Sequence, residues 1–72
     1  MLAEFGLNDR QKKIIVFLKS YARISNAECQ ILTGAPRKAT TRDLGGLVDA
    51  GLLVRIGERR GAYYVLARNK RT

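Results

Sequence analysis

Residues 25–51, SNAECQILTGAPRKATTRDLGGLVDAG, contain two helix signals separated by a very short connection, and this stretch decides the fold. Ser25 or Asn26 can cap the first helix, because both side chains accept hydrogen bonds from free backbone amides. Glu28 stands three residues after Ser25, which is the spacing of a capping box. Gly34 is the residue type that ends helices in the left-handed conformation. A short helix is therefore predicted between these signals.

The second helix of this stretch is predicted over residues 36–50, with Pro36 in its first turn, a position that proline suits. Its buried side is expected to consist of Thr40, Leu44, Leu47 and Val48. Gly51 follows Ala50 and closes the helix. Because only about three residues connect the two helices, they form a helix-turn-helix pair whose second helix keeps its outer face free.

Another helix precedes this pair and is capped by Asn8, with Gln11 at the capping-box position. Its core-facing stripe is predicted to consist of Ile14, Phe17, Leu18 and Tyr21, flanked by Gln11 and Ile15. Val16 lies nearly opposite this stripe and is expected to be exposed. A single exposed valine is common on protein surfaces, and a contact with a subunit or another domain is the alternative.

Beyond Gly51 the apolar residues recur with a period of about 2 instead of 3.6, which predicts strands at residues 52–56 and 62–66. Glycines bracket the charged turn at residues 57–61, as in a hairpin. An isolated hairpin is only marginally stable in water, so one of its faces must pack on the helices. We expect this face to consist of Leu52, Ile56, Tyr64 and Leu66. Helices followed by a hairpin predict a mainly helical α+β domain, a winged helix-turn-helix.

The chain has 72 residues, which is enough for one domain, and a net charge of +8. The charge is uneven, because residues 37–72 hold nine basic and three acidic side chains, against five and three in residues 1–36. A basic domain of this kind has a polyanion as its expected partner. We interpret residues 1–6 as a lead-in or a cloning remnant, residues 7–67 as the domain and residues 68–72 as a basic tail.

The composition argues against several kinds of chemistry. The chain has no histidine and a single cysteine, so no cofactor, zinc site or internal disulfide is expected, and Cys29 is expected to be a buried thiol. The carboxylates are scattered, each with a helix-end or surface explanation: Glu4, Asp9, Glu28, Asp43, Asp49 and Glu58. We therefore expect no enzymatic activity. The longest apolar run, Ile14–Leu18, is too short to span a membrane. The single cysteine fits a reducing compartment, and a cytoplasmic location is expected.

The candidate DNA-binding residues lie on the helix at 36–50 and on the hairpin: Arg37, Lys38, Thr41, Arg42, Arg55, Arg59 and Arg60. At about 100° per residue, Lys38 and Arg42 point away from the core and Thr41 lies at the side. Arginine and lysine suit guanine edges and phosphates, and recognition helices present their N-terminal residues to the major groove. The hairpin arginines suit phosphates or a narrow minor groove. The alternative is that both clusters are merely solvated surface.

Gly45 and Gly46 are unusual inside a helix, because each glycine costs about 0.8–1 kcal/mol relative to alanine. One explanation is an exposed helix face that tolerates the loss. The other is close approach of a phosphate backbone or a neighbouring subunit, which only a residue without Cβ permits.

Six segments together resemble a group of bacterial winged-helix domains: LNDRQKKI (7–14), ISNAE (24–28), LTG (32–34), TRDL (41–44), LVDAGLL (47–53) and GAYYVL (61–66). Domains with this pattern form the C-terminal ends of RecG-like ATP-dependent DNA helicase-related proteins and of transcriptional regulators with an AlbA-type domain. Fic-family proteins often end similarly, and DeoR-type repressors begin with a related unit. The chain departs from this pattern at Pro36, where a Ser or Thr cap is usual, and at Gly45 and Gly46, where charged residues are usual.

The resemblance implies binding of double-stranded DNA, with the helix at 36–50 in the major groove and the wing at 57–61 on the phosphate backbone. The domain would belong to a transcriptional regulator or be the accessory domain of a larger protein. Helicase activity would belong to another part of that parent, because no nucleotide-binding motif is present. The alternative function is protein–protein docking or dimerisation, including a homodimer, with Val16 and the glycine pair at the contact. Salt separates the two functions, because DNA binding weakens steeply with ionic strength.

Overall fold

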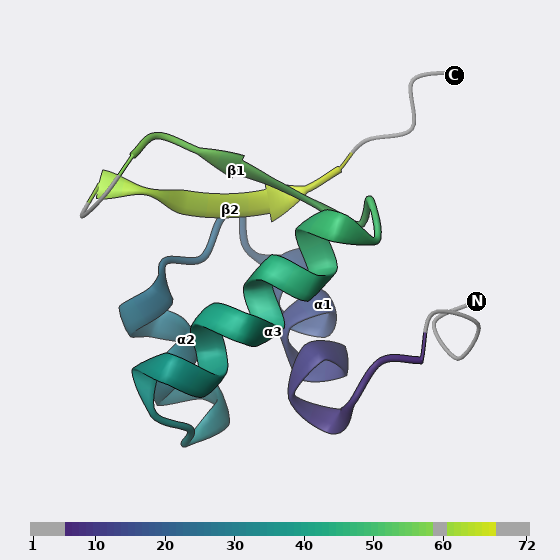
Figure 1. Cartoon of the computed structure of the whole chain (residues 1–72). Helices are drawn as coiled ribbons and strands as arrows, with labels where there is room; N and C mark the ends of the chain where they lie inside the picture. The colour runs from purple at the N-terminus through teal and green to yellow at the C-terminus, as the bar shows by residue number, and fades with distance from the viewer. Residues whose placement is uncertain (1–5, 59–60, 68–72) are drawn as a thin grey trace.

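The structure, a computed structural model, describes residues 6–58 and 61–67 of the chain. Its elements in chain order are α1 (Asp9–Ser20), α2 (Asn26–Thr33), α3 (Arg37–Asp49), β1 (Leu53–Ile56) and β2 (Tyr63–Leu66) (Figure 1). The predicted order of three helices and then an antiparallel hairpin is confirmed. Arg59, Arg60, the expected basic tail and residues 1–5 lie outside the described residues.

Helices α1 and α2 begin at the predicted capping boxes. Asn8 Oδ1 accepts a hydrogen bond from the amide of Gln11 at 2.8 Å, and the amide of Asn8 donates to Gln11 Oε1 at 3.0 Å. Of the two caps considered for α2, the structure selects Ser25, which pairs reciprocally with Glu28. Gly34 ends α2 in the left-handed conformation with a φ of +72°. The short connection of the helix-turn-helix begins at this left-handed residue and leads into α3.

Pro36 lies one position outside α3, so the prediction that it occupies the first helical turn is wrong. Its ψ of 162° is extended, which makes it the N-cap residue, and α3 begins at Arg37. Pro36 makes no side-chain hydrogen bond to the first amides of α3, unlike the N-cap residues of α1 and α2.

The core lies between the three helices and the inner face of the hairpin. Its buried apolar residues are Ile14, Ile15, Leu18, Ile24, Cys29, Leu44, Leu47 and Leu53. The predicted burial of Cys29 and Thr40 is confirmed. Tyr21 is not in the core, because it is the C-cap residue of α1 and its extended backbone takes it out of the helical stripe. Its side chain is 60% exposed and its ring stacks on Phe17, with the ring centroids 4.5 Å apart.

The hairpin register pairs Leu53 with Leu66 and Arg55 with Tyr64. Directly paired residues share a face of the sheet, so Leu53 and Arg55 are on the side of the helices. Leu53 is 2% exposed, whereas Ile56 on the opposite face is 38% exposed. The prediction that Ile56 faces the core is therefore wrong, because the inward positions of β1 are shifted by one residue.

The segment before α2 holds the hairpin against the helices. Ile24 exchanges two backbone hydrogen bonds with Tyr64, at 3.0 and 2.8 Å, and forms an isolated bridge to β2. As expected, Leu52, Tyr64 and Leu66 pack against the core. These contacts fix the position of β1 and β2 relative to α3 (Figure 1).

Candidate nucleic-acid interface

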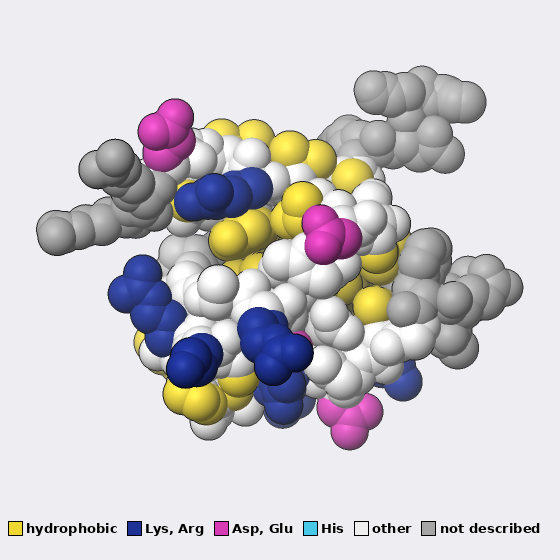
Figure 2. All heavy atoms as spheres, viewed as in Figure 1, with side chains coloured by type: hydrophobic (Ala, Val, Ile, Leu, Met, Phe, Trp, Pro, Cys, Tyr) yellow, Lys and Arg dark blue, Asp and Glu magenta, His cyan; other side chains and the backbone are white. Residues whose placement is uncertain are grey.

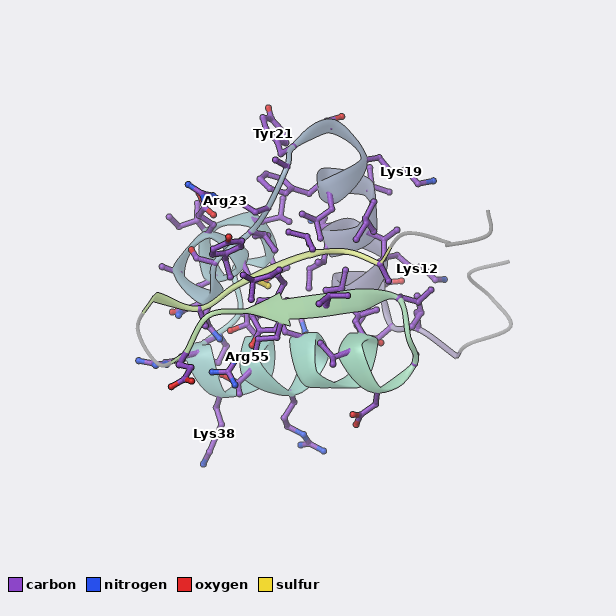
Figure 3. All side chains as sticks on the ribbon, turned by 90° about the horizontal axis from the view of Figure 1, so that it is seen from above. Lys12, Lys19, Tyr21, Arg23, Lys38 and Arg55 are labelled. Carbon is purple, nitrogen blue, oxygen red and sulfur yellow. The ribbon has the colours of Figure 1, made fainter. Side chains whose placement is uncertain are left out.

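The outer side of α3 carries exposed basic side chains in its N-terminal half. Arg37, Lys38, Thr41 and Arg42 are all exposed, as the sequence predicts. Lys38 points straight away from the body of the domain (Figure 3). Figure 2 shows lysine and arginine side chains gathered over the N-terminal half of α3, with an acidic side chain over its C-terminal half. The structure therefore presents one basic helix face to solvent.

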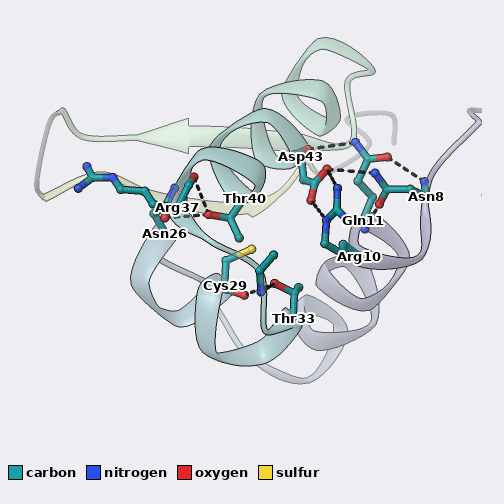
Figure 4. A network of polar contacts seen from close by, with 10 residues as sticks. Asn8, Arg10, Gln11, Asn26, Cys29, Thr33, Arg37, Thr40 and Asp43 are labelled. Atoms are coloured by element: carbon teal, nitrogen blue, oxygen red, sulfur yellow. Dashed lines mark hydrogen bonds and ion pairs between the residues drawn. The ribbon is translucent and has the colours of Figure 1, made fainter.

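A polar network fixes the N-terminal half of α3 against α2. The Thr40 hydroxyl donates to Asn26 Oδ1 at 2.9 Å (Figure 4). Asn26 Nδ2 donates in turn to Thr41 Oγ1, also at 2.9 Å. Gln30 Nε2 also donates to Asn26 Oδ1, at 2.8 Å. Sequence reasoning treated Asn26 only as a possible cap and missed this link. The network sets the position of Thr41, a candidate DNA-binding residue, at the start of the exposed face.

Asp43 fixes the middle of α3 against the first turn of α1. Arg10 Nε lies 2.5 Å from Asp43 Oδ2, and Asn8 Nδ2 donates to Asp43 Oδ1 at 3.0 Å (Figure 4). Gln11 Nε2 donates to the backbone carbonyl of Asp43 at 3.2 Å. Asp43 is only 4% exposed, so its interpretation as a routine surface or helix-end carboxylate is wrong. Its spacing, three residues after Thr40, already placed it on the buried side.

The environment of Asp43 favours the charged carboxylate. Burial alone raises the pKa of Asp43, but the hydrogen bonds from Arg10 and Asn8 and the charge of Arg42 outweigh it. The net pKa of Asp43 therefore lies below its ordinary value. In return, the hydrogen bond to Asp43 raises the pKa of Arg10. The two groups thus stay oppositely charged at neutral pH.

Gly46 is explained by a contact inside the domain. A Cβ at Gly46 would lie 2.9 Å from Gln11 Nε2, whereas a Cβ at Gly45 would meet nothing within 4 Å. The close neighbour of Gly46 is thus α1 of the same chain. Gly45 fits the explanation of a helix face that tolerates glycine.

A hollow of about 350 Å³ opens between α2, α3 and the hairpin. Arg37 and Thr41 of α3, Asn26 of α2, and Arg55 and Tyr64 of the hairpin contribute to its lining. Among the described residues that line it, none is acidic. Arg55 was predicted to act with the wing tip, but its inward register places it beside α3 (Figure 3). Arg59 and Arg60 lie outside the described residues.

The opposite face of the hairpin is held by a different arginine. Arg23 lies over the ring of Tyr63, with its guanidinium carbon 4.9 Å from the ring centroid. The outward-facing Tyr63 therefore has a cationic partner within the domain. Tyr64, its neighbour on the inner face, packs against the core.

The remaining chemistry-bearing residues form no further centre in the described part of the chain. Cys29 is fully buried, and burial raises the pKa of its thiol to about 11. Among residues 6–58 and 61–67, no group of three or more Asp, Glu, Cys or His residues could hold a metal ion. Within the same residues, no helix has the length and apolar character needed to cross a membrane.

Comparison with known proteins identifies relatives of the fold. No protein-family model matches the sequence, and no curated protein matches it. The chain is 27% identical to a MarR family transcriptional regulator from Silicibacter pomeroyi DSS, with a TM-score of 0.76, over 93% of this chain and 45% of that one. RV1404 from Mycobacterium tuberculosis is 28% identical, with a TM-score of 0.76, over 86% and 44% of the two chains. The fold is a winged helix-turn-helix.

Reduced HlyU from Vibrio cholerae N16961 has the same fold at a TM-score of 0.80 and 22% identity, over 96% of this chain and 72% of that one. The chain thus spans less than half the length of the MarR family regulator and of RV1404. The shared part is the three helices and the hairpin described above, because the matches cover nearly the whole of this chain.

Proposed function

We propose that the chain binds double-stranded DNA as the DNA-binding domain of a transcriptional regulator. The observation that carries the proposal is the exposed basic face of α3, formed by Arg37, Lys38 and Arg42, on the second helix of a helix-turn-helix. Such a helix enters the major groove and presents its N-terminal residues to base edges. The likeness to a MarR family transcriptional regulator supports the same function.

In this proposal the residues of α3 have different roles. Arg42 and Lys38 face outward, away from the core, and can donate to guanine edges in the groove. Thr41 is held by Asn26 and lies at the side of the helix, where it meets the edge of the groove. Asp43 and its partners hold α3 at a fixed angle to α1, so that these side chains reach the DNA together. A role for the wing at residues 57–61, including Arg59 and Arg60, on the phosphate backbone stays a prediction.

The parent protein is a further part of the proposal. We infer that residues 7–67 are a domain of a larger regulator that acts on DNA in the cytoplasm, because the chain matches less than half of the similar regulator. The resemblance to helicase-related bacterial proteins stays a prediction, and the comparison with a transcriptional regulator favours a regulatory parent. Docking or dimerisation as the main function is not favoured, because the similar solved structures include a transcriptional regulator.

A homodimer, or docking to other domains of the parent, stays a prediction that concerns a different surface. Val16 is 59% exposed, as predicted, and lies with Phe17 and Leu32 at a shallow apolar hollow of α1 and α2. Val16→Lys would disrupt a contact there without touching α3. Its effect on the sedimentation of the chain therefore separates self-association from DNA binding.

The proposed function is tested by titrating the chain against random-sequence duplex DNA at several salt concentrations. Each neutralised phosphate contributes about −0.9 to the slope of log affinity against log salt. If five of the candidate basic residues each neutralise one phosphate, the slope is about −4 to −5. Affinity that is undetectable at low salt, or that does not change with salt, would show that the chain does not bind DNA in this way.

A further inference from the structure

The inner face of β1 carries an arginine where the register calls for an apolar residue. Leu53 and Arg55 are on the same face of the hairpin, and Leu53 is 2% exposed in the core. Two residues further along the strand, Arg55 pairs with Tyr64, whose side chain packs against the core. Arg55 is nevertheless exposed, because the strand there passes over the hollow between α2 and α3. Core packing therefore does not explain the arginine at this position.

The same hollow holds a second arginine from a different element. Arg37 is the first residue of α3 and lines the hollow with Arg55 and Thr41. Among residues 6–58 and 61–67, no acidic side chain lines the hollow and neither arginine forms an ion pair. Two arginines that line one hollow, with no acidic residue among its described lining residues, favour an anion there. Their planar, multiple donors match the oxygens of a phosphate.

We propose that Arg37 and Arg55 bind one and the same phosphate group of the DNA backbone in this hollow. The inference rests on the proposed function. It means that β1 and the start of α3 contact the same phosphate of the DNA. When α3 lies in the major groove, the strand of DNA that borders the groove passes its flank, where the hollow opens beside Thr41. The phosphate then bridges the recognition helix and the hairpin. Arg55 acts with α3 and independently of the wing tip.

A shared phosphate and two separate phosphates predict different changes in the salt dependence of DNA affinity. If both arginines neutralise one phosphate, losing both makes the log–log salt slope shallower by about 0.9. If each binds its own phosphate, the slope changes by about 1.8. Two groups that bind one anion are also energetically coupled, so their effects on affinity do not multiply.

The experiment is a double-mutant cycle of Arg37→Gln and Arg55→Gln, measured with random duplex DNA at several salt concentrations. Each single variant should weaken binding roughly tenfold at low salt, and the double variant by clearly less than the product of the two. The slope of the double variant should be shallower by about 0.9. Lys12→Gln/Lys19→Gln removes the same charge from α1, whose labelled lysines point away from Lys38 (Figure 3), and should leave the affinity nearly unchanged.

The outcomes separate the inference from the proposed function. If the losses of affinity in the two single variants multiply in the double variant, and its salt slope changes by about 1.8, the arginines bind two phosphates and the inference is wrong. Normal binding by Arg55→Gln would overturn it as well, while leaving DNA binding by α3 intact. Absence of binding by the unaltered chain would overturn both. Both positions are exposed, and thermal unfolding of each variant verifies that the fold is retained.

Discussion

Arg10 in the first turn of α1 and Asp43 in the middle of α3, 33 residues apart in the sequence, form an ion pair that joins the two helices. The pair is asymmetric, because the side chain of Asp43 is 5% exposed and that of Arg10 is 43% exposed. The buried carboxylate therefore needs its partners to stabilise its charge, whereas the more exposed guanidinium of Arg10 can also be solvated by water. Because Asp43 lies on α3, the same contacts that stabilise the domain also position the proposed DNA-binding face.

Replacing Asp43 should destabilise the domain markedly. Asp43→Ala removes the carboxylate that accepts hydrogen bonds from Asn8 Nδ2 and Arg10 Nε, and a hydrogen bond to a charged group is worth about 1.5–3 kcal/mol. We expect the free energy of unfolding in urea to fall by this amount. Asp49→Ala is the matched control, because Asp49 is an exposed acid on the same helix and should change stability by less than about 0.5 kcal/mol. Equal effects of the two variants would contradict the role of Asp43.

The stability of the domain should fall in acid through Asp43. The pKa of Asp43 in the folded chain lies below its ordinary value, so the unfolded chain binds more protons wherever the two states differ. Stability from this group is complete above the ordinary value of about 3.9 and is lost as the pH falls below it, through the folded pKa. Chemical unfolding between neutral pH and pH about 2 measures this loss. Asp43→Asn should flatten that part of the profile, and an unchanged profile would count against it.

The two neighbouring glycines of α3 should respond differently to alanine. Gly45→Ala meets open space and should raise the free energy of unfolding by about 0.8–1 kcal/mol through helix propensity. Gly46→Ala must displace Gln11 Nε2 and with it the hydrogen bond to the Asp43 carbonyl, worth about 0.5–1.5 kcal/mol. We therefore expect little or no gain at Gly46.

A Gln11→Ala background provides the control for this pair. Without the Gln11 side chain the obstacle to a Cβ at Gly46 is gone, so Gly46→Ala should then stabilise the domain as much as Gly45→Ala does. If Gly46→Ala is already stabilising in the unaltered chain, the contact with Gln11 does not explain the glycine.

Much of the fold could be predicted because local signals agree with one another. The capping boxes at Asn8 and Ser25 and the left-handed Gly34 all stand where the structure has helix ends. The hairpin register could not be predicted, because Leu52, Leu53 and Val54 are all apolar and leave the inward positions of β1 undecided. Tertiary packing decides between them.

The candidate site was predicted in part, and its supporting residues were missed. Arg37, Lys38, Thr41 and Arg42 are exposed as expected because helical periodicity is reliable along α3. Asp43 was missed because burial was considered only for apolar side chains and Thr40. Its partners lie on α1, and no spacing within one helix reveals a contact between two helices.

The most direct test of the account compares two variants that remove equal charge from different helices. Arg37→Gln/Lys38→Gln/Arg42→Gln on α3 and Lys12→Gln/Lys13→Gln/Lys19→Gln on α1 each lower the net charge from +8 to +5. Measured by fluorescence anisotropy with labelled duplex DNA, the α3 variant should bind at least about tenfold more weakly than the α1 variant. Its salt slope should also be shallower than that of the α1 variant, because phosphate contacts are lost on α3. Equal losses in both variants would mean that DNA responds only to total charge, and α3 would not be the binding element.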